Sequence, residues 1–141
     1  MPARQAIAEW KGDLKGGSGR VKLGSGAYEG NYSFTSRFEN GPGANPEELI
    51  GAALAGCYSM ALANSLASAG HTPTSVHTTA DVHLGKDDKG FLITRIDLTV
   101  DAIVPGLDNA TFQQDAEKTR TGCIIGRALA ATPTTLKAVL K

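Results

Sequence analysis

The segment from Asn45 to Gly70 carries the longest consistent local signal in this chain, and it predicts a helix. Asn45 can accept a hydrogen bond from the free N–H groups of a first turn, Pro46 suits the first helical position, and Gly70 supplies a stop. No charged side chain occurs from 49 to 63. Because a surface helix would show a polar stripe every 3.6 residues, the pattern predicts a helix enclosed by other structure.

Small residues are unusually dense in this segment. They are Gly51, Ala52, Ala53, Ala55, Gly56, Ser59, Ala61 and Ala63. Each glycine in a helix interior costs about 1 kcal/mol relative to alanine. We therefore expect another backbone to approach this helix closely. A membrane span, which needs about 20 apolar residues, is the alternative. The polar Tyr58, Asn64 and Ser65 and the lack of a basic flank argue against it.

The length and the charge of the chain limit the classes of function that the protein can have. The 141 residues predict one domain, 1–141, large enough to bury a core. Fourteen basic and fourteen acidic side chains cancel and form no basic run, so neither nucleic acid nor a membrane surface is expected as a partner. The first ten residues lack the apolar core of a signal peptide, which predicts a cytoplasmic protein.

Two cysteines, Cys57 and Cys123, are the reactive side chains of interest. Cytoplasmic thiols stay reduced, so these residues are expected to be reactive, metal-binding or buried rather than a permanent disulfide. Their spacing from each other and from His71, His77 and His83 is not that of a zinc site. We therefore predict no metal and no cofactor. His77 and His83 fit solvated positions of a strand better than a ligand or proton-transfer role.

The rest of the chain predicts an α+β fold. Residues 7–11, 20–24 and 32–37 have the patterns of strands in a meander, and 76–83 and 91–104 those of a hairpin closed by the turn 85–90. A second helix is expected from Asp108 or Asn109 to about Arg120, a short helical turn at Cys123, and a last strand over 134–140.

A thiol in the middle of an apolar helix is most often inert packing material, and that interpretation of Cys57 stays open on composition alone. As a nucleophile the thiol must ionise, and each unit by which its pKa falls takes about 1.4 kcal/mol of preferential stabilisation of the thiolate. Arg37 is the candidate for the positive charge this requires, and a solvated surface arginine is the alternative.

Three segments resemble the OsmC/Ohr family, which comprises the osmotically inducible protein C and the organic hydroperoxide resistance proteins. They are Thr35 to Glu39, Gly43 to Ala53 and Ala55 to Ala61. The match extends over essentially the whole chain, and the branch of the osmotically inducible protein C is the closer one. The resemblance implies antiparallel sheets wrapped around a long central helix in an intertwined homodimer. It also implies a thiol peroxidase that reduces organic hydroperoxides, and hydrogen peroxide less efficiently, with a lipoyl-type dithiol as reductant.

By the same resemblance, Cys57 corresponds to the peroxidatic cysteine and Cys123 to the resolving one. Arg37 corresponds to the arginine that activates the thiolate, and Glu47 to the carboxylate that orients that arginine. Many relatives have proline and serine where this chain has Ile124 and Gly126, so a buried cysteine at a helix start is the alternative for Cys123. Apolar walls for a peroxide tail are expected from Ile124, Ile125, Met60 and Phe38.

Helix geometry adds a constraint, because Glu47 and Cys57 are ten residues apart and hence about 15 Å apart along one axis. One helix therefore cannot bring them together. If two copies cross antiparallel near Ala52 and Ala53, Glu47 of one chain approaches Cys57 of the other. Two alternatives to the enzyme stay open on the sequence, namely a non-catalytic homodimer that binds a small apolar ligand and a redox sensor.

Overall fold

The computed structural model describes residues 1–141 and divides the chain into two compact units, Met1–Leu49 and Ile50–Lys141. The division falls within the long helix α2, Pro46–Ser68. The interpretation of the chain as one domain stays a prediction.

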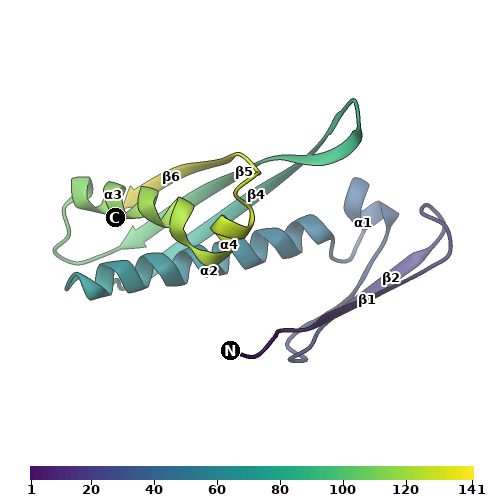
Figure 1. Cartoon of the computed structure of the whole chain (residues 1–141), viewed down its shortest axis with the longest axis horizontal. Helices are drawn as coiled ribbons and strands as arrows, with labels where there is room; N and C mark the ends of the chain where they lie inside the picture. The colour runs from purple at the N-terminus through teal and green to yellow at the C-terminus, as the bar shows by residue number, and fades with distance from the viewer. The chain divides into compact units, whose positions relative to one another are not determined.

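The first unit contains a three-stranded antiparallel sheet in the order β1-β2-β3, coloured purple to blue in Figure 1. The strands are β1, Ala6–Lys11, β2, Ser18–Leu23, and β3, Glu29–Tyr32. The predicted meander is confirmed, but its third strand lies earlier than predicted. The rings of Trp10 and Tyr32 meet over Gly19, with centroids 5.4 Å apart. A side chain at Gly19 would overlap both rings, so glycine permits this contact.

The predicted strand over 32–37 is wrong beyond Tyr32, because the helix α1, Phe34–Phe38, follows β3 directly. Ser33 starts this helix through a capping box: its Oγ accepts from the N–H of Ser36, and the Ser33 N–H donates to Oγ of Ser36. This reciprocal cap outweighs the strand preference of the neighbouring aromatic residues. Arg37 therefore lies in the last turn of a short helix.

The predicted helix over 45–70 is confirmed as α2, and the Oδ1 of Asn45 caps it by accepting from the N–H of Glu48. The structure buries one side of α2, where the residues are spaced by four: Leu54, Tyr58, Leu62 and Leu66. The opposite side, with Ala52, Ala53, Gly56 and Met60, is exposed in the single chain. By length and composition alone α2 could cross a membrane, but its buried side belongs to the hydrophobic core of the second unit.

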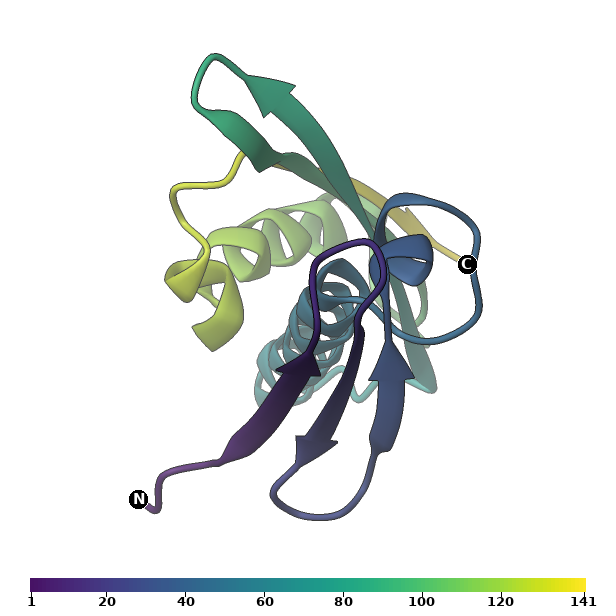
Figure 2. The same ribbon diagram turned by 90° about the vertical axis from the view of Figure 1, so that its right-hand side faces the viewer.

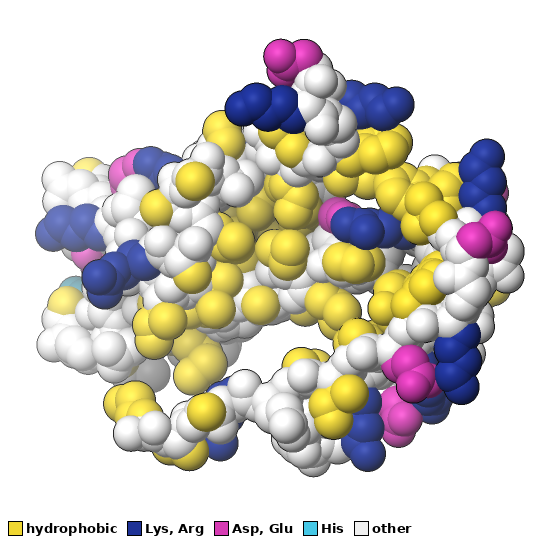
Figure 3. Space-filling view, turned by 45° about the vertical axis from the view of Figure 1, so that its right-hand side comes forward, with side chains coloured by type: hydrophobic (Ala, Val, Ile, Leu, Met, Phe, Trp, Pro, Cys, Tyr) yellow, Lys and Arg dark blue, Asp and Glu magenta, His cyan; other side chains and the backbone are white.

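The second unit has a mixed sheet in the order β4-β5-β6. The long hairpin of β4, Ser75–Asp87, and β5, Gly90–Ile103, is antiparallel as predicted, whereas β6, Thr134–Leu140, pairs parallel to β5. A parallel partner requires a crossover connection, and the segment after Val104 provides it. Figure 3 shows the charged side chains that surround the tip of the hairpin.

The crossover contains α3, Asn109–Gly122, capped by Asp108, and α4, Ile124–Ala128, capped by Cys123. In Figure 2 α2 and α3 lie on the same side of the β4-β5-β6 sheet. One hydrophobic core joins α2, α3 and the sheet, and its largest members are Leu54, Tyr58, Leu62, Leu66, Ile96, Leu98, Val100 and Phe112. The hydroxyl of Tyr58 donates to the carbonyl oxygen of Ala116 at 2.9 Å, so α2 and α3 are also tied by a buried hydrogen bond.

The glycines of α2 meet different surroundings. A Cβ on Gly51 would lie 3.3 Å from the carbonyl oxygen of Ala80 and 3.3 Å from Cγ2 of Val82, so the expected close approach is to β4. A Cβ on Gly56 would meet nothing within 4 Å. No contact within a single chain therefore requires a glycine at position 56.

Candidate functional site

The two cysteines come together in the second unit although they are far apart in the sequence. Both are free thiols; Cys57 is half-buried in the middle of α2, and Cys123 is 3% exposed at the junction of α3 and α4. The two sulfur atoms lie beside the same turn of the chain, at the start of α4. The fold therefore brings the two thiols to one place in the second unit.

Each sulfur also accepts a hydrogen bond from a backbone amide of α4. The N–H of Ile125 donates to Sγ of Cys57 at 3.4 Å, and the N–H of Gly126 donates to Sγ of Cys123 at 3.3 Å. Sequence reasoning missed these two donors. The available signal was the cysteine in the N-cap position of α4, where a side chain ordinarily accepts from the amides of the first turn.

The thiol of Cys123 has opposing influences on its pKa. Burial, the largest influence, raises the pKa, and the neighbouring Cys57 thiol raises it further. The hydrogen bonds from the Gly126 and Ile125 amides act in the opposite direction. The net result is a raised pKa, so Cys123 is held as a neutral thiol next to the more accessible Cys57.

The two departures from the family pattern have simple local explanations. Ile124 occupies the first position of α4, where a backbone N–H has no intrahelical partner, so proline and isoleucine both suit this position. A Cβ on Gly126 would lie 2.8 Å from the carbonyl oxygen of Arg120 and 3.0 Å from Sγ of Cys123. In this chain glycine therefore allows the first turn of α4 to approach Cys123 closely.

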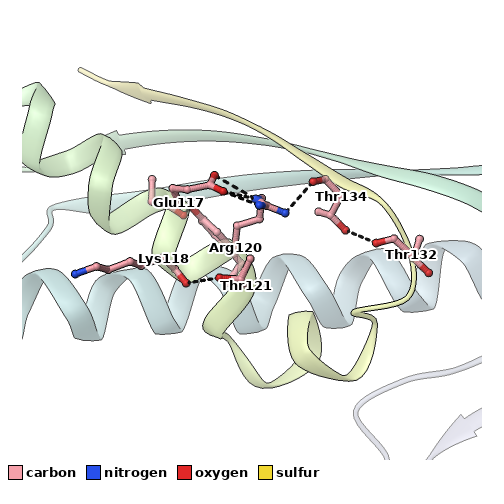
Figure 4. A network of polar contacts seen from close by, with 8 residues as sticks. Glu117, Lys118, Arg120, Thr121, Thr132 and Thr134 are labelled. Atoms are coloured by element: carbon pink, nitrogen blue, oxygen red, sulfur yellow. Dashed lines mark hydrogen bonds and ion pairs between the residues drawn. The ribbon is translucent and has the colours of Figure 1, made fainter.

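Arg120 fixes the end of α3 that leads into Cys123 (Figure 4). Its Nε and Nη2 donate to the carboxylate of Glu117, and its Nη1 donates to the carbonyl oxygen of Thr134 at 3.1 Å. The guanidinium thus ties the last turn of α3 to the start of β6. Since the N–H of Cys123 bonds to the carbonyl oxygen of Thr119, this tie also limits the movement of Cys123.

The predicted arginine and carboxylate come together in the first unit. Arg37 binds Glu47 through Nη2 to Oε1 at 2.8 Å and through Nε to both carboxylate oxygens, at 3.2 and 3.3 Å. Glu47 is 8% exposed in the first turn of α2, and the Arg37 side chain is 38% exposed. The carboxylate therefore orients a guanidinium whose other edge still has N–H groups to donate.

Short polar contacts hold this pair in place. Asn45 caps α2 and also donates through Nδ2 to the carbonyl oxygen of Ser36 at 3.1 Å, while Oγ of Ser36 donates to the carbonyl oxygen of Ala44 at 2.7 Å. The end of α1 and the start of α2 are thus joined directly around Arg37 and Glu47. Sequence reasoning found the cap but missed this second function of Asn45.

A groove of about 410 Å³ lies beside Arg37 in the first unit. Half of its lining residues are aromatic, namely Trp10, Tyr32, Phe34 and Phe38, and the others are Gly12, Leu14, Ser33 and Arg37. Of the predicted apolar walls, Phe38 lines this groove and Ile125 packs against the core of the second unit. Ile124 and Met60 are 78% and 77% exposed in the single chain.

The four predicted site residues thus form two pairs in two units, Cys57 with Cys123 and Arg37 with Glu47. Among the His, Cys, Asp and Glu side chains of the chain, no group of three or more could hold a metal ion.

Known proteins resemble this chain in sequence and in fold. The model of the family described as OsmC-like protein matches residues 39–137. The protein named Peroxiredoxin OsmC from Escherichia coli is 50% identical over 129 residues, which cover 91% of this chain and 90% of that relative.

Solved structures with lower sequence identity share the fold. An organic hydroperoxide resistance protein OsmC from Legionella pneumophila matches with a TM-score of 0.71 and 21% identity, over 97% of this chain and 96% of that one. The organic hydroperoxide resistance protein OhrB of Bacillus subtilis matches with a TM-score of 0.68 and 21% identity, over 97% of this chain and 98% of that one. At these identities the likeness shows the fold alone.

Proposed function

The chain belongs to the OsmC family, and from this premise we propose that it is a cysteine-based peroxidase that reduces organic hydroperoxides to alcohols, and hydrogen peroxide less efficiently. The relative named Peroxiredoxin OsmC supports a peroxidase activity. The observation that carries the proposal is that the thiols of Cys57 and Cys123, one half-buried and the other buried, accept hydrogen bonds from two successive backbone amides, those of Ile125 and Gly126.

The chemistry follows from these positions. The Cys57 thiolate attacks the outer peroxide oxygen, the O–O bond breaks, and the alcohol leaves after it takes up a proton. The resulting sulfenic acid at Cys57 reacts with the Cys123 thiol, water leaves, and a Cys57–Cys123 disulfide forms. A dithiol, which we propose to be of the lipoyl type, then reduces this disulfide and restores both thiols.

Arg37 and Glu47 complete the proposed site. The guanidinium of Arg37 stabilises the Cys57 thiolate and donates to a peroxide oxygen, because its charge and its free N–H groups suit both tasks. Glu47 is a positioning residue, since its carboxylate binds the Nε and Nη2 of Arg37 and leaves the opposite edge of the guanidinium for the substrate.

We further propose that the active site lies at the interface of a homodimer, where Arg37 and Glu47 of one chain serve Cys57 of the other. The small side of α2 supports this, because Ala52, Ala53 and Gly56 are exposed in the single chain. A bulky charge there, as in Ala53→Glu, is expected to convert a dimer into a monomer in sedimentation experiments. The exposed Asn64→Glu in the same helix, outside the proposed crossing, serves as the control. The protein is proposed to act in the cytoplasm.

The peroxidase is tested by peroxide consumption in the presence of dihydrolipoamide, with cumene hydroperoxide and hydrogen peroxide in parallel. The expected result is turnover that favours the organic peroxide and is abolished in Cys57→Ser. Cys123→Ser is expected to retain one round of peroxide reduction and to lose disulfide formation. Equal peroxide consumption by the natural chain and Cys57→Ser, with thiols intact at the start, would contradict the proposal.

A further inference from the structure

The two sulfurs of the proposed disulfide differ in how an attacking thiolate can reach them. Cys57 is half-buried, whereas Cys123 is 3% exposed and enclosed at the junction of α3 and α4. A hydroperoxide must reach Sγ of Cys57 in the first half of the reaction. The same approach then admits the reductant to Sγ of Cys57, while the surroundings of Cys123 obstruct attack on its sulfur.

The hydrogen bond to Sγ of Cys123 suits this sulfur to be the leaving group when the disulfide opens. When a disulfide opens, the electron pair of the S–S bond moves to the sulfur that was not attacked. The N–H of Gly126 already points at Sγ of Cys123, at 3.3 Å, and a hydrogen bond to an anion is stronger than one to a neutral sulfur. A negative charge that forms on this sulfur is therefore stabilised by a hydrogen-bond donor that is already in position.

We infer that the dithiol attacks Sγ of Cys57 and that Cys123 departs as the leaving thiolate, stabilised by the backbone N–H of Gly126. The inference rests on the proposed function for the identity of the disulfide. It assigns a catalytic role to the Gly126 amide, which contacts a reacting atom.

The step balances as a thiol–disulfide exchange. A reductant thiolate forms a bond to Sγ of Cys57, the Cys57–Cys123 bond breaks, and the electron pair stays on Cys123, which then takes up a proton. The second thiol of the reductant ionises and attacks the reductant sulfur of the mixed disulfide, which releases the Cys57 thiolate. The dithiol is thereby oxidised to a cyclic disulfide by two electrons, and the protein disulfide is reduced by two.

The raised pKa of Cys123 explains why a donor is needed. Burial makes the Cys123 thiolate costly, and a thiol of higher pKa leaves more slowly. The Gly126 amide acts against this cost. A side chain at this position would lie 3.0 Å from Sγ of Cys123 and 2.8 Å from the carbonyl oxygen of Arg120, so it would move the amide away from the sulfur.

The attacked sulfur is identified by mapping a mixed disulfide. The Cys57–Cys123 disulfide is formed with diamide, so that the experiment does not depend on peroxidase activity. The oxidised protein is treated with the monothiol N-acetylcysteamine, quenched in acid, alkylated while denatured and analysed by peptide mass spectrometry. The expected adduct lies on Cys57, with the alkyl group on Cys123. An equal or larger share of adduct on Cys123 would overturn the inference.

The amide is tested with Gly126→Ala against the matched control Gly122→Ala, since a Cβ on Gly122 would meet nothing within 4 Å. The disulfide of Gly126→Ala is expected to open about fivefold more slowly than that of the control, as for the loss of one hydrogen bond. Equal rates of opening would overturn the role of Gly126.

Discussion

The first unit, Met1–Leu49, and the second unit, Ile50–Lys141, are stabilised in different ways. In the first, Ala44 is the one buried hydrophobic side chain, and its other buried side chains are the polar Ser36 and Glu47. The second buries a continuous core of aliphatic and aromatic side chains from α2, β5 and α3. The second unit thus has a hydrophobic core of its own, whereas the first relies on strand pairing, caps and an ion pair.

This difference matches the chemistry proposed for each unit. The second unit fixes two sulfurs within a packed framework, which suits a disulfide that must form and open in one geometry. The first unit presents a charged arginine beside an aromatic groove. A sheet of three short strands without a core is marginally stable by itself, so the first unit is expected to need cover from a second copy of the chain.

The largest effect is expected from the core of the second unit. Leu62 is fully buried, so Leu62→Ala should lower the free energy of unfolding by about 2–5 kcal/mol through lost burial and a cavity. In the first unit, Leu14 is 59% exposed, and Leu14→Ala should cost less than about 1 kcal/mol. Urea unfolding of both variants checks this contrast. Equal losses would contradict the difference between the units.

The next largest effect is expected from loss of the ion pair between Arg37 and Glu47 in the first unit. Glu47→Ala removes the acceptor of the Arg37 hydrogen bonds and should cost about 1–3 kcal/mol of stability. It should also lower peroxidase activity at least about tenfold, because Arg37 loses its fixed orientation. Glu48→Ala is the matched control, since Glu48 is exposed in the same helical turn. Thermal unfolding and steady-state kinetics of both variants measure these effects.

A smaller effect is expected from the cap of α1. Ser33→Ala removes the side-chain oxygen that accepts from the N–H of Ser36 and should cost about 1 kcal/mol. Ser25→Ala provides a control in an exposed turn of the same unit. If the two variants unfold at the same urea concentration, the capping box does not stabilise the first unit.

The smallest expected effect is a dependence of stability on pH, through Asp97 in β5 of the second unit. Hydrogen bonds from Thr135, Arg95 and His83 lower the pKa of Asp97 to about 2. A carboxyl whose pKa is lower in the folded state stabilises the fold above its unfolded pKa of 3.8, and this contribution is lost as the pH falls toward 2. Asp97→Asn should therefore melt slightly below the natural chain at pH 6. The difference should disappear between pH 4 and pH 2.

Much of this architecture was predictable from the sequence, because α2, the β4–β5 hairpin and β6 have strong local signals. The helix α1 was missed since its capping box depends on two serines within an aromatic run that favours a strand. The parallel pairing of β6 depends on the crossover through α3 and is not visible in the strand itself. The residues alone indicated Cys57, Cys123 and Arg37 as candidates, and the resemblance to a family added Glu47 and the role of each. The hydrogen bonds from Ile125 and Gly126 to the sulfurs required coordinates.

The central claim is that Arg37 of one chain and Cys57 of another form one active site. It is tested most directly by refolding Cys57→Ser and Arg37→Ala together, each nearly inactive alone, and measuring the consumption of cumene hydroperoxide. Random pairing gives half heterodimers, each with one intact site of two, so about one quarter of the natural activity should return. If the mixture is no more active than the separate variants, each chain completes its own site and the claim is contradicted.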